Sequence, residues 1–87
     1  MSEKLVEQSL VNRVKALGGI AFKFTSPGRR SVPDRLCLFP GGRVIFVECK
    51  SLRKRPTALQ AREHDRLRAL GFDVRVIDSK EAANALT

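Results

Sequence analysis

The chain has 87 residues without an internal repeat or a linker, so we expect a single domain over residues 1–87. Seventeen Lys and Arg oppose nine Asp and Glu, and the formal net charge of +8 favours a polyanionic partner such as nucleic acid. No apolar run approaches the roughly 20 residues of a membrane span and no secretory pattern opens the chain, which argues against a membrane partner and against export.

The first half of the chain alternates between periodic apolar segments and polar loops. Apolar residues at helical spacing predict a helix over 3–17, and alternating apolar residues predict a strand over 20–24. A polar loop leads to a predicted hairpin with strands 34–39 and 43–50. We expect the hairpin to bury one apolar face made of Leu36, Leu38, Val44 and Phe46.

The second half begins with the basic loop 51–56 and continues with a helix that Thr57 caps and Gly71 ends. Alternation over 72–76 predicts a fourth strand, and a final helix follows from Asp78 to about Leu86. Capping-box patterns open both helices and pair Thr57 with Gln60 and Asp78 with Glu81. The order α-β-β-β-α-β-α predicts an α/β fold, a small mixed four-stranded sheet flanked by helices.

Size and cysteine content bound the environment of this fold. A chain this short buries only about 60% of its unfolded surface, so its core is marginal and we expect dimerisation to supplement it. The two cysteines, Cys37 and Cys49, do not form the paired framework of a disulfide-rich protein. We therefore expect a reduced, cytoplasmic protein.

Three charged residues converge on one end of the hairpin. Glu48 and Lys50 share a strand face, and a tight turn brings Asp34 beside Glu48 if the register allows it. Two carboxylates this close repel each other unless a cation lies between them, and hard oxygen ligands select Mg²⁺ or Mn²⁺. Cys49 points its thiol to the opposite face, which leaves its backbone carbonyl as a third oxygen ligand. Lys50 can then orient an attacking water and offset negative charge in the transition state.

A structural explanation competes with this hypothesis. Glu-x-Lys on a strand is usually a solvated ion pair, and Pro33-Asp34 alone is a turn signal. Glu7 favours the site, because it projects from the apolar face of the first helix, where an unpaired carboxylate is costly. Gln60 is explained equally well as a helix cap and as a site residue. His64, the only histidine, is expected on the protein surface.

Basic residues flank the predicted site and would hold phosphates, giving affinity without sequence choice. They are Arg29, Arg30, Arg35, Arg53, Lys54 and Arg55.

The motifs Glu7, "SVPDR" with Asp34, "VECK" with Glu48 and Lys50, and "ALQ" with Gln60 resemble a known pattern. They resemble the virus-type replication-repair nuclease (VRR-NUC) domain of the PD-(D/E)xK nuclease superfamily, in its stand-alone form, over roughly residues 3–78. The resemblance implies a restriction-endonuclease-like fold and Mg²⁺- or Mn²⁺-dependent phosphodiester hydrolysis. It also implies that Glu7, Asp34, Glu48 and the Cys49 carbonyl bind metal, that Lys50 assists catalysis and that Gln60 supports the site.

Stand-alone members of this family resemble homodimeric Holliday-junction resolvases from bacteria or phages, which implies branched or double-stranded DNA as substrate. Three other interpretations stay open at this point. One is a non-catalytic DNA-binding module on the same fold, and another is a nuclease acting on flaps or other branched DNA. The third is a basic protein that binds acidic partners.

Overall fold

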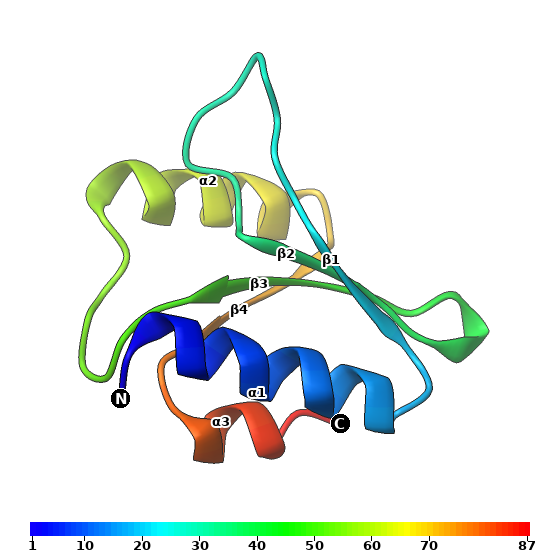
Figure 1. Ribbon diagram of the computed structural model, residues 1–87. Helices are drawn as coiled ribbons and strands as arrows, with labels where there is room; N and C mark the ends of the chain where they lie inside the picture. The colour runs from blue at the N-terminus through cyan, green and yellow to red at the C-terminus, as the bar shows by residue number, and fades with distance from the viewer.

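The computed structural model describes residues 1–87, and it places three helices on the two faces of one four-stranded sheet (Figure 1). The element order agrees with the order predicted from the sequence, with one short 3₁₀ turn, η1, inserted in the hairpin. The elements are α1 (Glu3–Ala16), β1 (Ile20–Lys23), β2 (Arg35–Leu38), η1 (Pro40–Gly42), β3 (Val44–Cys49), α2 (Ala58–Ala69), β4 (Asp73–Ile77) and α3 (Lys80–Asn84).

The sheet is mixed, as predicted, with the strand order β1-β2-β3-β4. β1 and β2 are antiparallel, β2 and β3 are antiparallel, and β4 runs parallel to β3. The antiparallel pairs need only short connections, whereas the parallel pair needs the crossover that α2 provides. None of the three helices has the length and hydropathy that crossing a membrane requires.

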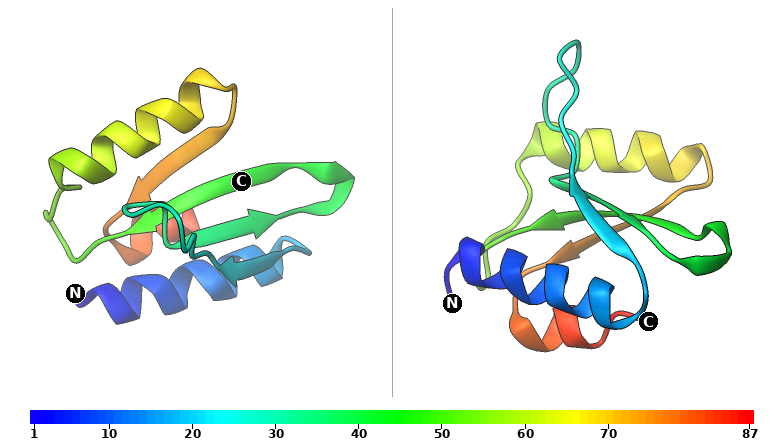
Figure 2. Two further views of the ribbon diagram at one scale, coloured as in Figure 1. Left: turned by 90° about the horizontal axis from the view of Figure 1, so that it is seen from above. Right: turned by 45° about the vertical axis from the view of Figure 1, so that its right-hand side comes forward.

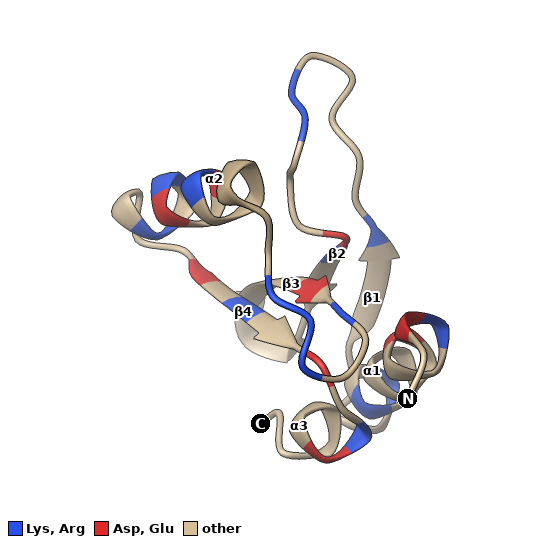
Figure 3. Ribbon diagram, turned by 90° about the vertical axis from the view of Figure 1, so that its left-hand side faces the viewer, with Lys and Arg blue, Asp and Glu red and all other residues tan.

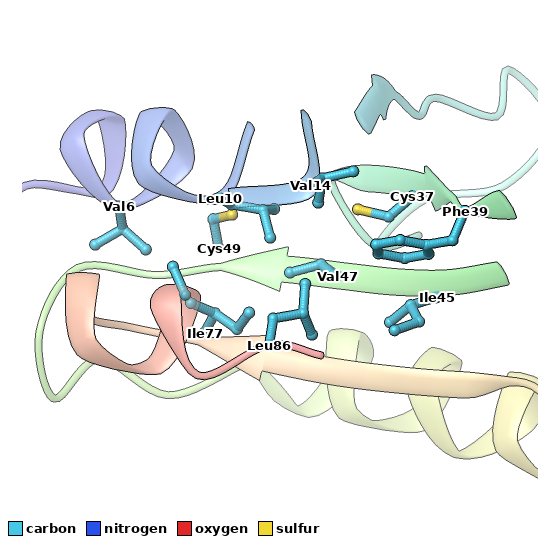
Figure 4. Close-up of a cluster of buried hydrophobic side chains, with 11 residues drawn as sticks. Val6, Leu10, Val14, Cys37, Phe39, Ile45, Val47, Cys49, Ile77 and Leu86 are labelled. Carbon is cyan, nitrogen blue, oxygen red and sulfur yellow. The ribbon is translucent and has the colours of Figure 1, made fainter. Parts of the chain in front are cut away.

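The two faces of the sheet are covered unequally. α1 and α3 lie on one face, and α2 lies on the other, where it packs over β4 (Figures 1 and 2). The apolar core lies between the sheet and the α1/α3 pair (Figure 4). It consists of Val6, Leu10, Val14, Cys37, Phe39, Ile45, Val47, Cys49, Ile77, Ala83 and Leu86.

The predicted buried face of the hairpin is therefore wrong. Ile45 and Val47 are fully buried, whereas Val44 and Phe46 are half-buried and Leu38 is exposed. Both faces of the hairpin are apolar, so alternation alone could not say which one two helices would cover. On the α2 side, the ring of Phe46 packs against Phe24 and Phe72, each with a centroid distance of 5.6 Å.

The helix ends show which predicted caps form. Ser2 caps α1, and Gly18, with φ +85°, follows the helix end. Thr57 and Gln60 form the predicted capping box of α2, with both reciprocal hydrogen bonds. The predicted cap of the last helix is wrong, because the Ser79 side chain, not Asp78, accepts the hydrogen bond from the first turn of α3.

Candidate active site

The register of the hairpin brings Asp34 and Glu48 together at the end of β3. Arg35 pairs with Val47, so Asp34, one residue earlier, comes opposite Glu48. The backbone N–H of Cys49 donates to Asp34 Oδ2 at 2.9 Å, which fixes the Asp34 carboxylate at this strand end. Figure 3 shows acidic positions just before β2 and at the end of β3, with basic positions in the loop that follows β3.

Glu48 is the most perturbed acidic group of the protein. Its side chain is only 2% exposed. Burial, followed by the hydrogen bond and the negative charge of Asp34, raises the pKa of Glu48 to about 8, although Lys50 opposes the rise. One carboxylate oxygen, Oε1, has no hydrogen-bond partner. An acidic pair with an unsatisfied oxygen has the chemistry of a site for a hard cation.

Lys50 and Gln60 approach the other oxygen of Glu48. Lys50 Nζ lies 3.8 Å from Glu48 Oε2, and Gln60 Nε2 donates to the same oxygen at 3.4 Å. Gln60 Oε1 also accepts from the backbone N–H of Thr57 at 2.9 Å. One end of the Gln60 amide therefore caps the helix, as one of the two explanations predicted, and the other end contacts Glu48.

Glu7 does not reach this carboxylate pair. It is half-buried on α1, and its Oε2 accepts a hydrogen bond from Arg35 Nε at 2.8 Å. No three acidic, histidine or cysteine side chains are arranged to hold a metal ion without further movement. Glu3, in the first turn of α1, is the acidic residue of that helix whose charge acts on Glu48, where it raises the pKa slightly.

Arg35, expected to bind DNA, is engaged inside the protein. Besides its ion pair with Glu7, its Nη1 donates to the backbone carbonyl of Ala21 at 2.9 Å. Its side chain is only 14% exposed. Arg35 is the first residue of β2, and its side chain contacts Glu7 on α1. The sequence motif showed only that Arg35 is next to Asp34 along the chain, so this direction could not be predicted from it.

Cys49 behaves as its place in the strand predicts. Its thiol is fully buried in the core (Figure 4). Because side chains alternate along a strand, it lies on the opposite face from Glu48. Burial raises the pKa of the thiol to about 12, so the thiol stays protonated and takes no part in the site.

The expectation that His64 lies on the surface is wrong. His64 is 1% exposed, and its Nε2 lies 3.5 Å from Glu48 Oε1. Burial, followed by the positive charge of Arg68, lowers the pKa of His64. Charged neighbours along the sequence suggested a solvated residue, but at helical spacing His64 comes one turn after Gln60 and faces the sheet.

Basic residues line two clefts on the surface of the protein. Arg53, Lys54 and Arg55 line a cleft of about 600 Å³. A second cleft, of about 520 Å³, lies between the loop after β1 and α2. Its basic lining is Arg29, Arg30, Arg62 and Arg66.

The second cleft contains two arginines that the sequence analysis did not predict to bind DNA, and one predicted DNA-binding arginine that forms an ion pair within the protein. Arg62 and Arg66 were not predicted to bind DNA, although their i, i+4 spacing on a helix put them on one face. Arg29 forms an ion pair with the nearly buried Glu63, which lowers the pKa of Glu63 and ties the loop to α2. Arg30, which was predicted to bind DNA, is exposed.

Comparison with known proteins identifies the family. No model of a protein family matches the chain. The chain is 54% identical over 84 residues to "Putative nuclease p44" of Acyrthosiphon pisum secondary endosymbiont phage 1, which covers 97% of this chain and 90% of the relative. A solved structure described as a VRR_NUC domain superposes with a TM-score of 0.89 and 34% identity, covering 97% of this chain and 92% of that one.

These likenesses agree with the motifs and with the restriction-endonuclease-like arrangement of helices around the mixed sheet. The chain belongs to the VRR-NUC family of nucleases.

Proposed function

We propose that this protein is a metal-dependent endonuclease that hydrolyses phosphodiester bonds in branched DNA, with the four-way junction as its preferred substrate. The observation that carries the proposal is the buried carboxylate pair. Asp34 lies beside Glu48, and burial and Asp34 raise the pKa of Glu48 to about 8. In a basic VRR-NUC protein, such a pair next to Lys50 matches a site for a cation and a phosphate.

The cation in this proposal is Mg²⁺ or Mn²⁺. Asp34, Glu48 and the backbone carbonyl of Cys49 would hold it, and the unpartnered Oε1 of Glu48 supports this assignment. Glu7 would join them after its carboxylate leaves Arg35. When bound, the ion supplies positive charge that keeps both carboxylates ionised and that acidifies a bound water.

Lys50 and Gln60 have separate roles in the proposed reaction. The Lys50 ammonium lies 3.8 Å from Glu48 Oε2, where it can orient the attacking water and offset negative charge that develops on the phosphate. Gln60 holds the Glu48 carboxylate through its side-chain N–H groups while it caps α2.

The DNA backbone would run across the two basic clefts. Arg53, Lys54 and Arg55 are exposed after β3, and Arg62 and Arg66 are exposed on α2. Phosphate contacts from these residues would position the scissile bond without reading the bases. The net charge of +8 would give the association a strong dependence on salt.

A homodimer would supply the two active sites that paired cuts in a junction need. The sequence suggested the final helix and the sheet edges as apolar surfaces for self-association. The final helix is not available, because α3 packs on α1, and Ala83 and Leu86 are buried. The edge strand β1 and its neighbour leave Ile20, Phe22 and Leu38 exposed. We therefore propose that the β1 edge contacts the second copy, because contiguous exposed apolar residues are typical of interfaces.

The cysteines bear on where the enzyme acts. Cys37 and Cys49 are both free and buried. Free thiols are typical of reducing compartments, so we place the reaction in the cytoplasm of a bacterial or phage-infected cell.

A cleavage assay tests the proposal. End-labelled four-way junction, flap, duplex and single-stranded DNA are incubated with the protein in Mg²⁺, Mn²⁺ or EDTA, beside Asp34→Ala. A matched control is Glu81→Gln, which removes an exposed carboxylate on α3. We expect symmetric, metal-dependent cuts in the junction that Asp34→Ala abolishes and Glu81→Gln retains.

The other outcomes identify the alternatives. Cutting of flaps in preference to junctions would keep the chemistry and overturn the substrate. Salt-sensitive binding without cleavage of any substrate would make the protein a DNA-binding module. No retention of DNA at moderate salt would leave a basic protein with a different acidic partner.

A further inference from the structure

The one histidine of the chain lies where the proposed chemistry assigns it no role. His64 is on α2, is 1% exposed, and points its Nε2 toward Glu48 Oε1 at 3.5 Å. Neither of these two buried atoms has any hydrogen-bond partner. Two buried polar atoms that lie 3.5 Å apart and have no other hydrogen-bond partner are costly unless they interact when the site is in use.

α2 approaches Glu48 at two points that are one helical turn apart. Gln60 contacts Oε2, and His64 faces Oε1. A carboxylate contacted on one oxygen can still rotate about its last torsion, which is soft. Contacts on both oxygens from the same rigid helix would fix the plane of the carboxylate.

We propose that His64 is a positioning residue for Glu48. Its Nε2–H donates a hydrogen bond to one lone pair of Glu48 Oε1 and leaves the other lone pair for the cation. This bond sets the carboxylate orientation in which Oε2 lies toward Lys50 and Gln60. Hydrogen bonds in uncomplexed active sites are often long and shorten in the working complex, so 3.5 Å is compatible with this role. His64 touches neither DNA nor metal and acts only through Glu48.

The inference rests on the proposed metal site, because an oriented carboxylate matters where it is a ligand. Groups that hydrogen-bond metal ligands typically change metal affinity by about 10- to 100-fold when they are removed. A histidine that merely fills space under α2 would change the stability of the fold and leave the metal affinity unaltered. Metal affinity and thermal stability, measured on the same variants, therefore separate the two roles.

The test is the binding of Mn²⁺ to the DNA-free protein by titration calorimetry, with the melting temperature followed by circular dichroism. His64→Met keeps an apolar side chain of similar volume and removes the donor. His64→Gln keeps an N–H donor at a similar reach. Leu67→Ala is the matched control, because Leu67 is half-buried on the same helix and forms no hydrogen bond or ion pair with Glu48 through its apolar side chain.

We expect His64→Met to weaken Mn²⁺ binding by about tenfold or more and His64→Gln to stay within about threefold of the wild type. Leu67→Ala should lower the melting temperature without changing Mn²⁺ affinity.

Equal Mn²⁺ affinity in wild type and a folded His64→Met would overturn the positioning role and leave the proposed function intact. If His64→Met does not fold, the comparison uses His64→Gln, which keeps a donor, and His64→Leu, which has none. Equal losses of Mn²⁺ affinity in these two folded variants would overturn the positioning role. A wild type that binds no Mn²⁺ would overturn the metal site itself and this inference with it.

Discussion

The two faces of β3 differ although they are built from neighbouring residues of one strand. Ile45, Val47 and Cys49 lie in the fully buried apolar core beneath α1 and α3. Glu48, between the last two, lies toward α2 among Asp34, Lys50, Gln60 and His64. The difference teaches that this small domain separates stability from chemistry across the thickness of one sheet. Apolar packing on the core face stabilises the strand. The other face can therefore bury the Glu48 carboxylate although it contributes less apolar packing.

The largest expected effects come from changing one residue on each face of β3. Glu48→Gln removes the charge that the site depends on, so we expect cleavage to fall by at least about 10²-fold while the fold remains stable. Ile45→Ala opens a cavity in the core and should cost about 2–5 kcal/mol of unfolding free energy. Cleavage rates on the junction and denaturant unfolding of both variants measure these effects.

The proposed difference between the two faces would be wrong if the two variants did not affect stability and activity separately. Loss of activity in Ile45→Ala under conditions where it is fully folded would show that the core face also sets the chemistry. Full activity of Glu48→Gln in Mg²⁺ would remove Glu48 from the mechanism.

The next effect is the dependence of stability on pH in the absence of metal. Because the pKa of Glu48 is raised from 4.5 to about 8 in the folded state, the folded protein binds its proton more tightly than the unfolded chain. The stabilisation is complete below pH 4.5 and is lost as the pH rises through about 8. We therefore expect the melting temperature to fall over this range and the fall to be reduced in Glu48→Gln.

Scanning calorimetry in metal-free buffer checks this dependence, and added Mn²⁺ should reverse it by offsetting the charge. Identical pH profiles for wild type and Glu48→Gln would show that Glu48 ionises normally.

The smallest expected effect is on DNA affinity, when positive charges are removed from the α2 face or from the α1/α3 face. Arg62→Ala with Arg66→Ala removes two exposed cations from the cleft beside α2, and should weaken DNA binding and reduce the salt slope by about 2. Lys15→Ala with Lys80→Ala removes the same charge from exposed positions on α1 and α3. We expect this control to change the affinity much less, as measured by fluorescence anisotropy at several salt concentrations. Equal losses in both double variants would mean that net charge, not the cleft, determines binding.

Local patterns predicted the elements of the fold well. Helical spacing over α1, the Thr57–Gln60 capping box and the alternating apolar residues of the strands are properties of neighbouring residues, and each forms as expected. The pairing of Asp34 with Glu48 could also be predicted, because a short hairpin with a tight turn leaves few registers open.

The errors arise where contacts come from distant parts of the chain. The buried face of the hairpin was misjudged, because its covering depends on where α1 and α3 pack. His64 was expected in solvent, because its charged neighbours on α2 gave no indication of the sheet beneath it. Arg35 was expected to bind DNA, although Glu7, 28 residues away in sequence, engages it.

The sequence by itself determined the order of elements, the basic surface, the hairpin that joins Asp34 to Glu48 and the motifs of a nuclease, since these depend on composition and on spacing along the chain. Only the tertiary structure decided which sheet face became the core, which helix reaches Glu48 and which arginines stay free. The physical reason is that the burial and the pKa of a group depend on everything packed around it. For Glu48, part of that packing comes from α2, a separate helix that follows β3 after a basic loop, so the pattern of β3 alone could not predict it.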